Sequence, residues 1–372
     1  MGSAIDTSPE AVLRAAGELL DPSSGRSFGE LKMNAAADKL EAGGIRVRID
    51  LPTPASPHKK AIEALVRERL QPFGFTRTEV AFSATVRGSA AKAASATDLV
   101  PSAKNVVLIG SGKGGVGKST VSVNVAVALA RLGCKVGLLD ADIYGPSVPL
   151  MMGLFGAKPN SAADGRRVEP LQAYGVKVIS IGFFVDPDQA MIWRGPMLHG
   201  ALVQLLRDVA WGDLDYLVLD LPPGTGDIQL TIAQQVSVSG AVVVTTPQDV
   251  ALSDAIKAKT MFDKVSIPVL GFVENMSGFV CPHCQKETEI FSKGGAEAAA
   301  AKMAVPFLGR VPINLAVRTG GDDGRPVVAD HPELIEAQAL VRVAQNVADR
   351  VALANLTAVP RGQKPLVQLG KK

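Results

Sequence analysis

A glycine-rich stretch with two lysines, GSGKGGVGKST at residues 110–120, has residue types and spacing suited to phosphate binding. Gly112 begins the pattern G-x-x-x-x-G-K-[ST], and Gly117, Lys118 and Ser119 complete it. Glycines let successive backbone N–H groups point at phosphate oxygens, and the following helix adds its dipole. The stretch predicts an ATP-binding loop whose contacts are Gly112, Lys113, Gly114, Gly115, Val116, Gly117, Lys118, Ser119 and Thr120.

Two side chains of this loop have predicted chemical roles. Lys118 is expected to reach the β and γ phosphates as a catalytic residue, and Ser119 is expected to bind Mg²⁺. The alternative is a glycine-rich turn that binds nothing. The apolar strand NVVLIG before the loop and the periodic helix after it favour the nucleotide loop.

Acidic side chains follow two other apolar segments, where open α/β sheets place their ligands. Asp220 ends YLVLD and is expected to hold Mg²⁺ through water. Asp140 and Asp142 follow KVGLL. The alternative for Asp140 and Asp142 is that they only cap a following helix.

The pair CPHC places Cys281 and Cys284 where both thiolates could bind one metal centre. Two thiolates fill half of a four-coordinate site, and a two-fold dimer would supply four, a set suited to a [4Fe-4S] cluster. Zinc would accept the same ligands, a redox dithiol is a further alternative, and His283 could ligate. Cys134 follows the helix after the glycine loop and is interpreted as a buried structural thiol.

The elements that must position these residues begin near residue 105. Apolar segments alternate with helical ones, and their lack of a polar face indicates strands covered on both sides. The fold class predicted is α/β, a doubly wound, mainly parallel sheet. Its strands are expected at 105–110, 135–140, 177–182, 215–220, 241–246, 268–274 and 307–311.

The residues before position 105 predict a smaller unit. Helical patterns at 8–20 and 57–70 and strand patterns at 46–52 and 78–86 indicate a small α+β domain. The division expected is this domain at 1–87, a flexible linker at 88–104, an ATPase domain at 105–355 and a tail at 356–372.

Bulk properties exclude several classes of protein. Of the 372 residues 47% are hydrophobic and 20% charged, and the net charge is only +3, so no nucleic-acid partner is expected. No apolar run reaches the roughly 18 residues of a membrane span, and the N-terminus lacks a signal region. Three cysteines cannot form a disulfide framework. We expect a cytoplasmic protein with no membrane partner.

The form KGGVGKST resembles the deviant Walker A loop of the MinD, ParA and nitrogenase-iron-protein class of ATPases. The resemblance implies that Lys113 crosses a dimer interface to the partner's nucleotide, where it is catalytic; the alternative is a solvated surface lysine. It also implies that Asn275 pairs with the adenine edge and that Asp142 orients or activates the attacking water as a catalytic residue. The sequence GTG at 224–226, which follows Asp220, is expected to sense the γ phosphate.

Taken in order, GKGGVGKST, DADIYGPS, DLPPGTGD, ENMSGF and CPHC resemble the Mrp/ApbC family of iron–sulfur cluster carrier ATPases, over about residues 100–350. The resemblance implies a homodimer that hydrolyses ATP slowly, holds a labile [4Fe-4S] cluster between the two CxxC pairs and delivers it to apo iron–sulfur proteins, with scaffold proteins as candidate donors. The first 87 residues resemble an iron–sulfur-assembly domain, with Ser56 where that domain often carries a cysteine.

Two other functions share this architecture. A MinD- or ParA-type positioning ATPase would act on a membrane or DNA, but prolines at 360 and 365 interrupt the C-terminal tail, and the charge is low. Such an ATPase also leaves CPHC unexplained. A nitrogenase-iron-protein-like electron donor would instead keep a stable cluster with a low, reproducible potential.

Overall fold

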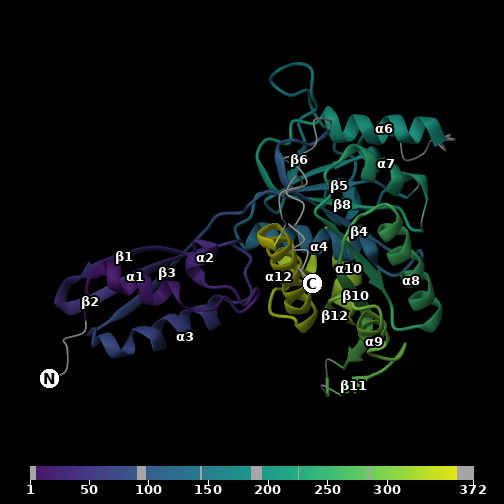
Figure 1. Cartoon of the computed structure of the whole chain (residues 1–372). Coiled ribbons are helices and arrows are strands. Elements are labelled where there is room, and N and C mark those ends of the chain that lie inside the picture. Colours follow the sequence, from purple (N-terminus) through teal and green to yellow (C-terminus); the bar gives the residue numbers. More distant parts are fainter. Residues whose placement is uncertain are drawn as a thin grey trace, which may run out of the picture.

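The computed structural model describes residues 6–89, 98–142, 145–185, 195–224, 226–281, 283–284 and 286–357. Two separate hydrophobic cores divide these residues into an N-terminal lobe and a larger α/β body. In Figure 1 the lobe projects to one side of the body, and the long helix α12 (Ile335–Thr357) lies between them. None of the helices in the described part of the chain is long and apolar enough to cross a membrane.

The N-terminal lobe is a three-stranded sheet with helices packed on it. Strand β2 (Gly44–Leu51) lies between β1 (Asn34–Leu40), which is antiparallel to it, and β3 (Thr78–Ala84), which is parallel. Alternate β2 residues Ile45, Val47 and Ile49 are fully buried. The helices and 3-10 turns of this lobe are α1 (Pro9–Gly17), α2 (Phe28–Leu31), η1 (Glu41–Gly43), α3 (Lys59–Leu70) and η2 (Gln71–Phe73).

The body is built on a nine-stranded sheet in the order β11-β10-β9-β4-β8-β5-β7-β6, with β12 also paired to β10. All pairs are parallel except β6 with β7 and β10 with β11. These strands are β4 (Ala103–Gly110), β5 (Val136–Asp140), β6 (Leu171–Ala173), β7 (Val176–Ser180), β8 (Leu214–Asp220), β9 (Gly240–Thr245), β10 (Val269–Val280), β11 (Glu287–Thr288) and β12 (Phe307–Ile313).

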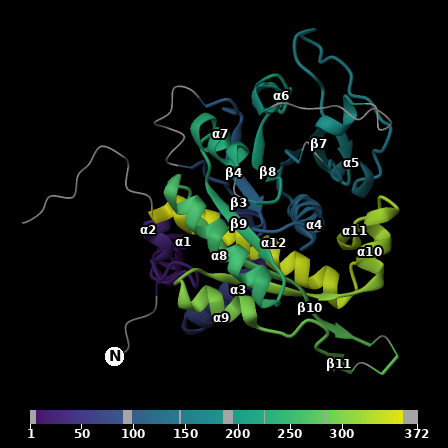
Figure 2. The same ribbon diagram turned by 90° about the vertical axis from the view of Figure 1, so that its right-hand side faces the viewer.

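Helices cover both faces of this sheet, and strands β5, β8 and β9 are buried at every residue (Figure 2). This confirms the doubly wound, mainly parallel α/β class, because strands without a polar face need cover on two sides. The helices are α4 (Lys118–Arg131), α5 (Val148–Met151), η4 (Ile181–Phe183), α6 (Gly195–Arg207), α7 (Asp227–Gln235), α8 (Asp249–Lys264), α9 (Gly295–Lys302), α10 (Leu315–Asp322), α11 (Val327–Asp330) and α12.

The boundaries differ from the sequence prediction in a few places. Strand β4 begins at Ala103, inside the range 88–104 predicted as linker, because Ala103 already pairs with Leu214 of β8. Strand β10 runs six residues beyond the predicted end at 274, to Val280. Helix α12 continues past 355 to Thr357, while residues 90–97 and 358–372 of the predicted linker and tail lie outside the described residues.

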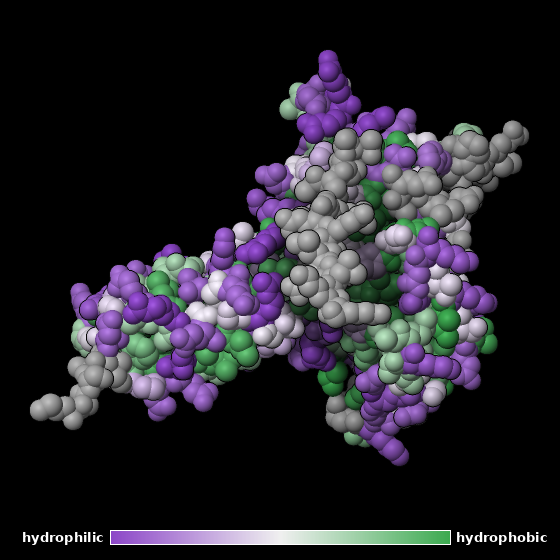
Figure 3. Space-filling model, in the orientation of Figure 1, coloured by the Kyte–Doolittle hydropathy of each residue, from purple (hydrophilic) through white to green (hydrophobic). Residues whose placement is uncertain are grey.

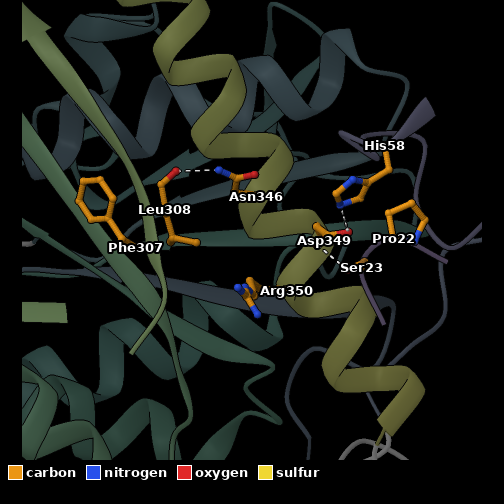
Figure 4. A pocket seen from close by; sticks show the side chains of 8 residues that line it. All are labelled: Pro22, Ser23, His58, Phe307, Leu308, Asn346, Asp349 and Arg350. Carbon is orange, nitrogen blue, oxygen red and sulfur yellow. Dashed lines mark hydrogen bonds and ion pairs between the residues drawn. The ribbon is translucent and has the colours of Figure 1, made fainter. Parts of the chain in front are cut away.

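The lobe is docked on the body through the segment 53–58. Ala55 is fully buried in the core of the body, and the Tyr216 hydroxyl donates to Thr53 Oγ1 (3.1 Å). On α12, the carboxylate of Asp349 accepts a hydrogen bond from Ser23 (2.7 Å) and lies 3.6 Å from His58 Nε2. Figure 4 shows these three side chains at a polar pocket of about 260 Å³ where lobe and body meet.

The visible surface is mainly hydrophilic on both parts, with smaller hydrophobic areas over the lobe and body (Figure 3). Ser56, which the sequence analysis singled out in the segment 51–60, is only 5% exposed. A side chain this buried within the docking segment contributes to packing in the docked arrangement.

Candidate functional site

The glycine loop joins β4 to α4 and lines a cavity of about 220 Å³. A side chain at Gly112 would meet the backbone oxygen of Asp254 at 2.0 Å, so only glycine fits there. Gly117 has φ +79°, and a Cβ on it would lie 2.2 Å from the side-chain nitrogen of Asn275. The glycines therefore permit a close approach of the loop to α8 and β10 as well as a backbone cradle.

Lys118, Ser119 and Asp220 form one hydrogen-bonded group at the base of the cavity. Lys118 Nζ lies 2.8 Å from Asp220 Oδ2, and the Ser119 hydroxyl donates to the same oxygen (2.6 Å). Ser122 donates to the other oxygen, Oδ1 (2.6 Å). Lys118 is 6% exposed and Asp220 fully buried, so the pair is shielded from solvent screening.

Asp142 and Asp140 have different surroundings. Asp142 lines the cavity 3.8 Å from Lys118 Nζ, and burial raises its pKa while Lys118 opposes the rise. Asp140 is fully buried and accepts from the backbone N–H of Asp142 (3.1 Å) and of Val148 (3.3 Å). Burial, reinforced by Asp220, raises the pKa of Asp140 to about 8. The helix-capping alternative therefore describes Asp140, which bonds the start of α5, but not Asp142.

Lys113 and Asn275 have different surroundings: the first is exposed and the second is buried. Lys113 is exposed at the rim of the cavity, and no carboxylate in the described ranges pairs with it. Asn275 is 7% exposed and donates from its amide to the backbone oxygen of Val116 (2.9 Å). The structure thus gives Asn275 a contact with the loop itself, while its pairing with adenine stays a prediction.

Sequence reasoning missed Gln229, which supports the loop after β8. Its amide nitrogen donates to the backbone oxygens of Pro222 (3.4 Å) and Gly224 (3.1 Å), while Gly224 N–H donates to Ser111 of the glycine loop (3.0 Å). Gln229 is 1% exposed, and its Oε1 has no hydrogen-bond partner within the described residues. A glutamine in helix α7 has no local pattern that would have indicated this role.

The cysteine pair lies at the tip of a hairpin formed by β10 and β11, which Figure 2 shows projecting from the body. Cys281 is partly exposed, Cys284 is exposed, and Cys281 N–H donates to Lys286 O (3.0 Å). Hydrogen bonds from the backbone of Cys284 and His283 lower the pKa of Cys281. Cys134 is buried far along the chain from the pair, and burial raises its pKa to about 11.

The two predicted sites are therefore separate but share strand β10. The nucleotide residues gather around the cavity, whereas Cys281 and Cys284 lie beyond the end of the strand that carries Asn275. Across the ranges that the structure describes, no three His, Cys, Asp or Glu side chains gather as a metal site.

A family model described as ParA, NUBPL iron-transfer P-loop NTPase, matches residues 102–348. The chain belongs to this family. The match covers the α/β body and confirms the resemblance that the five motifs indicated. Membership accounts for the phosphate loop, the acidic residues at the strand ends and the parallel sheet in one architecture.

Some similar proteins match almost the whole chain, and others match about two thirds of it. The iron-sulfur cluster carrier protein of Deinococcus radiodurans is 47% identical over 352 residues, 94% of this chain and 98% of that protein. The carrier protein of Escherichia coli K12 is 51% identical over 249 residues, 67% of this chain and 66% of that protein. A nucleotide-binding protein from Archaeoglobus fulgidus, solved with ADP, superposes with TM-score 0.54 at 40% identity, covering 60% of this chain and 88% of that one.

Proposed function

We propose that the protein is an ATP-dependent carrier of iron–sulfur clusters that acts as a homodimer in the cytoplasm. The observation that carries the proposal is that one chain combines two features: a phosphate loop with its acidic partners, and an accessible thiol pair directly after the strand that contacts this loop. Relatives named iron-sulfur cluster carrier proteins, which align over almost the whole chain, support it.

The residues of the phosphate loop fit ATP and Mg²⁺. Ser119 and Asp220 place a hydroxyl and a carboxylate oxygen 2.6 Å apart, a hard-oxygen set that Mg²⁺ prefers, and Lys118 already brings a positive charge to the same oxygen. Bound Mg²⁺ would neutralise negative charge on the β and γ phosphates. Lys118 would move from Asp220 to the phosphates, and the loop amides would hold them.

Hydrolysis then needs mainly positioning. Asp142, at the cavity wall, orients a water whose oxygen attacks the γ phosphorus; the bond from that phosphorus to the bridging oxygen breaks, leaving ADP and phosphate. Lys113, exposed at the rim, reaches the nucleotide of the second copy. Turnover is slow, since a carrier gains nothing from futile cycles.

The cluster is the cargo. Cys281 and Cys284 of two copies supply four thiolates to one [4Fe-4S] cluster, which passes to apo iron–sulfur proteins by exchange of thiolate ligands, with no change in oxidation state. Scaffold proteins are the proposed donors. A MinD- or ParA-type positioning ATPase has no use for this thiol pair.

Anaerobic reconstitution of the full-length protein with iron and sulfide tests the proposal. We expect about four irons per dimer and broad absorbance near about 400 nm, lost in Cys281→Ala and in Cys284→Ala but kept in Cys134→Ala. Chelators and apo-acceptors should remove the cluster. Tightly bound zinc with no iron uptake would overturn the carrier function, and a cluster that resists transfer would favour an electron donor.

A further inference from the structure

A buried carboxyl group lies on strand β10 between the phosphate loop and the cysteines. Glu274 is fully buried on strand β10, which pairs on one side with β9 and on the other with β12. Burying an ionisable side chain is costly unless its oxygens are satisfied. Such a residue in a strand is expected to have a specific task.

The oxygens of Glu274 join the two ends of the cysteine hairpin. Oε1 accepts from the Ser277 hydroxyl (2.5 Å) and from the backbone N–H of Gly294 (2.9 Å), and Oε2 accepts from the N–H of Ala296 (2.7 Å). Ser277 belongs to the strand entering the hairpin, and Gly294 and Ala296 begin helix α9 after it. Free N–H groups and the helix dipole at this terminus favour a negative acceptor.

The hairpin is also held nearer its tip. Phe279 and Val280 pair with β11, and Lys293 forms an ion pair with Glu287 of β11 (2.6 Å), directly before the Gly294 contact. The path from the Glu274 carboxyl to the cysteines is therefore hydrogen-bonded on both sides of the hairpin. A displacement at its base would be transmitted to the tip.

The neighbouring residue connects this base to the nucleotide cavity. Asn275 donates to Val116 O of the phosphate loop (2.9 Å), and Gly117 approaches it so closely that a Cβ would clash. The next residue, Met276, has φ +57°, a left-handed conformation that a non-glycine residue rarely adopts. The backbone between the loop contact and the hairpin is thus tightly constrained and able to pass on a shift of the loop.

We propose that Glu274 is a positioning residue that clasps the base of the cysteine hairpin and, through Asn275, couples nucleotide in the phosphate loop to the mobility of this hairpin and the reactivity of Cys281 and Cys284. Nucleotide that fixes the phosphate loop also fixes Val116 and the strand that contacts it, so the hairpin moves less and its thiols react more slowly. This rests on the proposed function for the nucleotide site, but not on the identity of the metal centre.

Thiol alkylation of the full-length apoprotein, with and without ADP and Mg²⁺, tests this coupling. Iodoacetamide labelling is followed by mass spectrometry at Cys281 and Cys284, with buried Cys134 as the internal reference. In the wild type we expect ADP to slow labelling at least about threefold. In Glu274→Gln the amide NH₂ faces backbone N–H donors, so labelling without ADP should be faster and the ADP effect less than about 1.5-fold.

Glu297→Gln is the matched control, because Glu297 lies in the first turn of the same helix but is exposed and paired with Arg310. It should behave as the wild type. If circular dichroism shows that Glu274→Gln does not fold, Ser277→Ala is tested in its place. This variant removes one of the three hydrogen bonds to the Glu274 carboxylate, so ADP should slow its labelling by an intermediate factor. An unchanged ADP effect in the folded Glu274 variant, or none in the wild type, would overturn the inference.

The two proposals can fail separately. Absence of iron uptake with intact ADP-dependent labelling would reject the carrier function and leave the coupling in place. A normal cluster together with labelling that ignores ADP in the wild type would reject the coupling alone.

Discussion

At the scale of single residues, the site is organised by charge. Lys118 has Asp220 at 2.8 Å and Asp142 at 3.8 Å, while Asp140 lies buried behind them. Burial is the main cause of the raised pKa of both Asp140 and Asp142, and the nearby charge of Asp220 adds to the rise. Lys118 therefore places one positive charge within 4 Å of both Asp142 and Asp220.

Replacing Lys118 tests this balance. In Lys118→Ala we expect ATP affinity to fall by at least about 100-fold and turnover to be lost, because the phosphates lose their main cation. The measurement is calorimetric binding and phosphate release. Lys104→Ala, which removes an ion pair with Asp215 away from the cavity, is the control and should bind ATP normally. Turnover near the wild-type rate in Lys118→Ala would contradict the assignment.

Cys134 gives a pH dependence of stability. Burial raises its pKa from 9.0 to about 11, so between these values the folded protein keeps a proton that the unfolded chain releases. The stabilisation of the folded protein by this proton is complete below pH 9 and is lost as the pH rises toward 11. The free energy of unfolding falls by about 2.7 kcal/mol at most as a result. Cys134→Ala should flatten this part of the urea-unfolding profile. If the unfolding free energy falls with pH at the same slope in the wild type and in Cys134→Ala, the thiol does not cause the pH dependence. Tyr216, whose pKa is also raised by burial, is present in both proteins and does not affect the comparison.

At the scale of elements, much of the site could be predicted from local sequence. Parallel strands end at one edge of a sheet, so Lys118, Asp142 and Asp220 were expected together and are found together. Strand β1 was missed because its sequence, NAAADKL, lacks apolar alternation and becomes a strand only by pairing with β2. Gln229 and Glu274 were missed because their partners are backbone atoms of other segments, and no spacing rule encodes such contacts.

Helix α7 provides a prediction about the loop after β8. Gln229→Ala removes both hydrogen bonds to the 222–224 backbone, so the loop contacting Ser111 should lose its fixed position. We expect kcat for ATP to fall about tenfold with a smaller change in KM, since the loss is one of positioning. Gln235→Ala, at the end of the same helix, should retain the wild-type rate. A rise in KM alone would show that Gln229 acts in binding.

At the scale of the whole molecule, the lobe and the body meet along α12, which also packs on the phosphate-loop helix α4 (Figure 1). Asp349 holds two separate segments of the lobe, at Ser23 and at His58 (Figure 4). Because α12 contacts both the lobe and the helix that begins at Lys118, docking of the lobe and the state of the nucleotide site share one structural element.

Asp349→Ala tests what holds the lobe. Loss of both contacts should cost about 1–2 kcal/mol of docking free energy, giving a lower first thermal transition. Hydrogen exchange at residues 53–56 should accelerate, because Ala55 is fully buried only while the lobe is docked. Asp322→Ala, which breaks an exposed pair with Arg318 within α10, should change neither measurement. Unchanged exchange in Asp349→Ala would assign docking to Thr53, Ala55 and Tyr216 instead.

The proposed dimer predicts that two inactive variants recover ATPase activity when they are mixed. Lys113→Ala and Asp142→Ala should each fold and each lose ATPase activity, because one lacks the group that crosses the interface and the other lacks the group that orients water. In a mixed dimer, one of the two composite sites combines Lys113 of the Asp142→Ala chain with Asp142 of the Lys113→Ala chain. Mixing equal amounts should therefore restore up to about one quarter of wild-type turnover, since about half of the dimers are mixed and each has one intact site.

The control for this complementation is Lys118→Ala in place of Asp142→Ala. Lys118 and Asp142 lie 3.8 Å apart in the same chain, so this mixture also builds one intact composite site and should restore a similar activity. By contrast, a chain carrying both Lys113→Ala and Asp142→Ala, mixed with Lys118→Ala, can form no intact site and should stay inactive. If differently tagged chains co-purify as mixed dimers and yet no mixture recovers turnover, Lys113 acts within its own chain and the composite site is wrong.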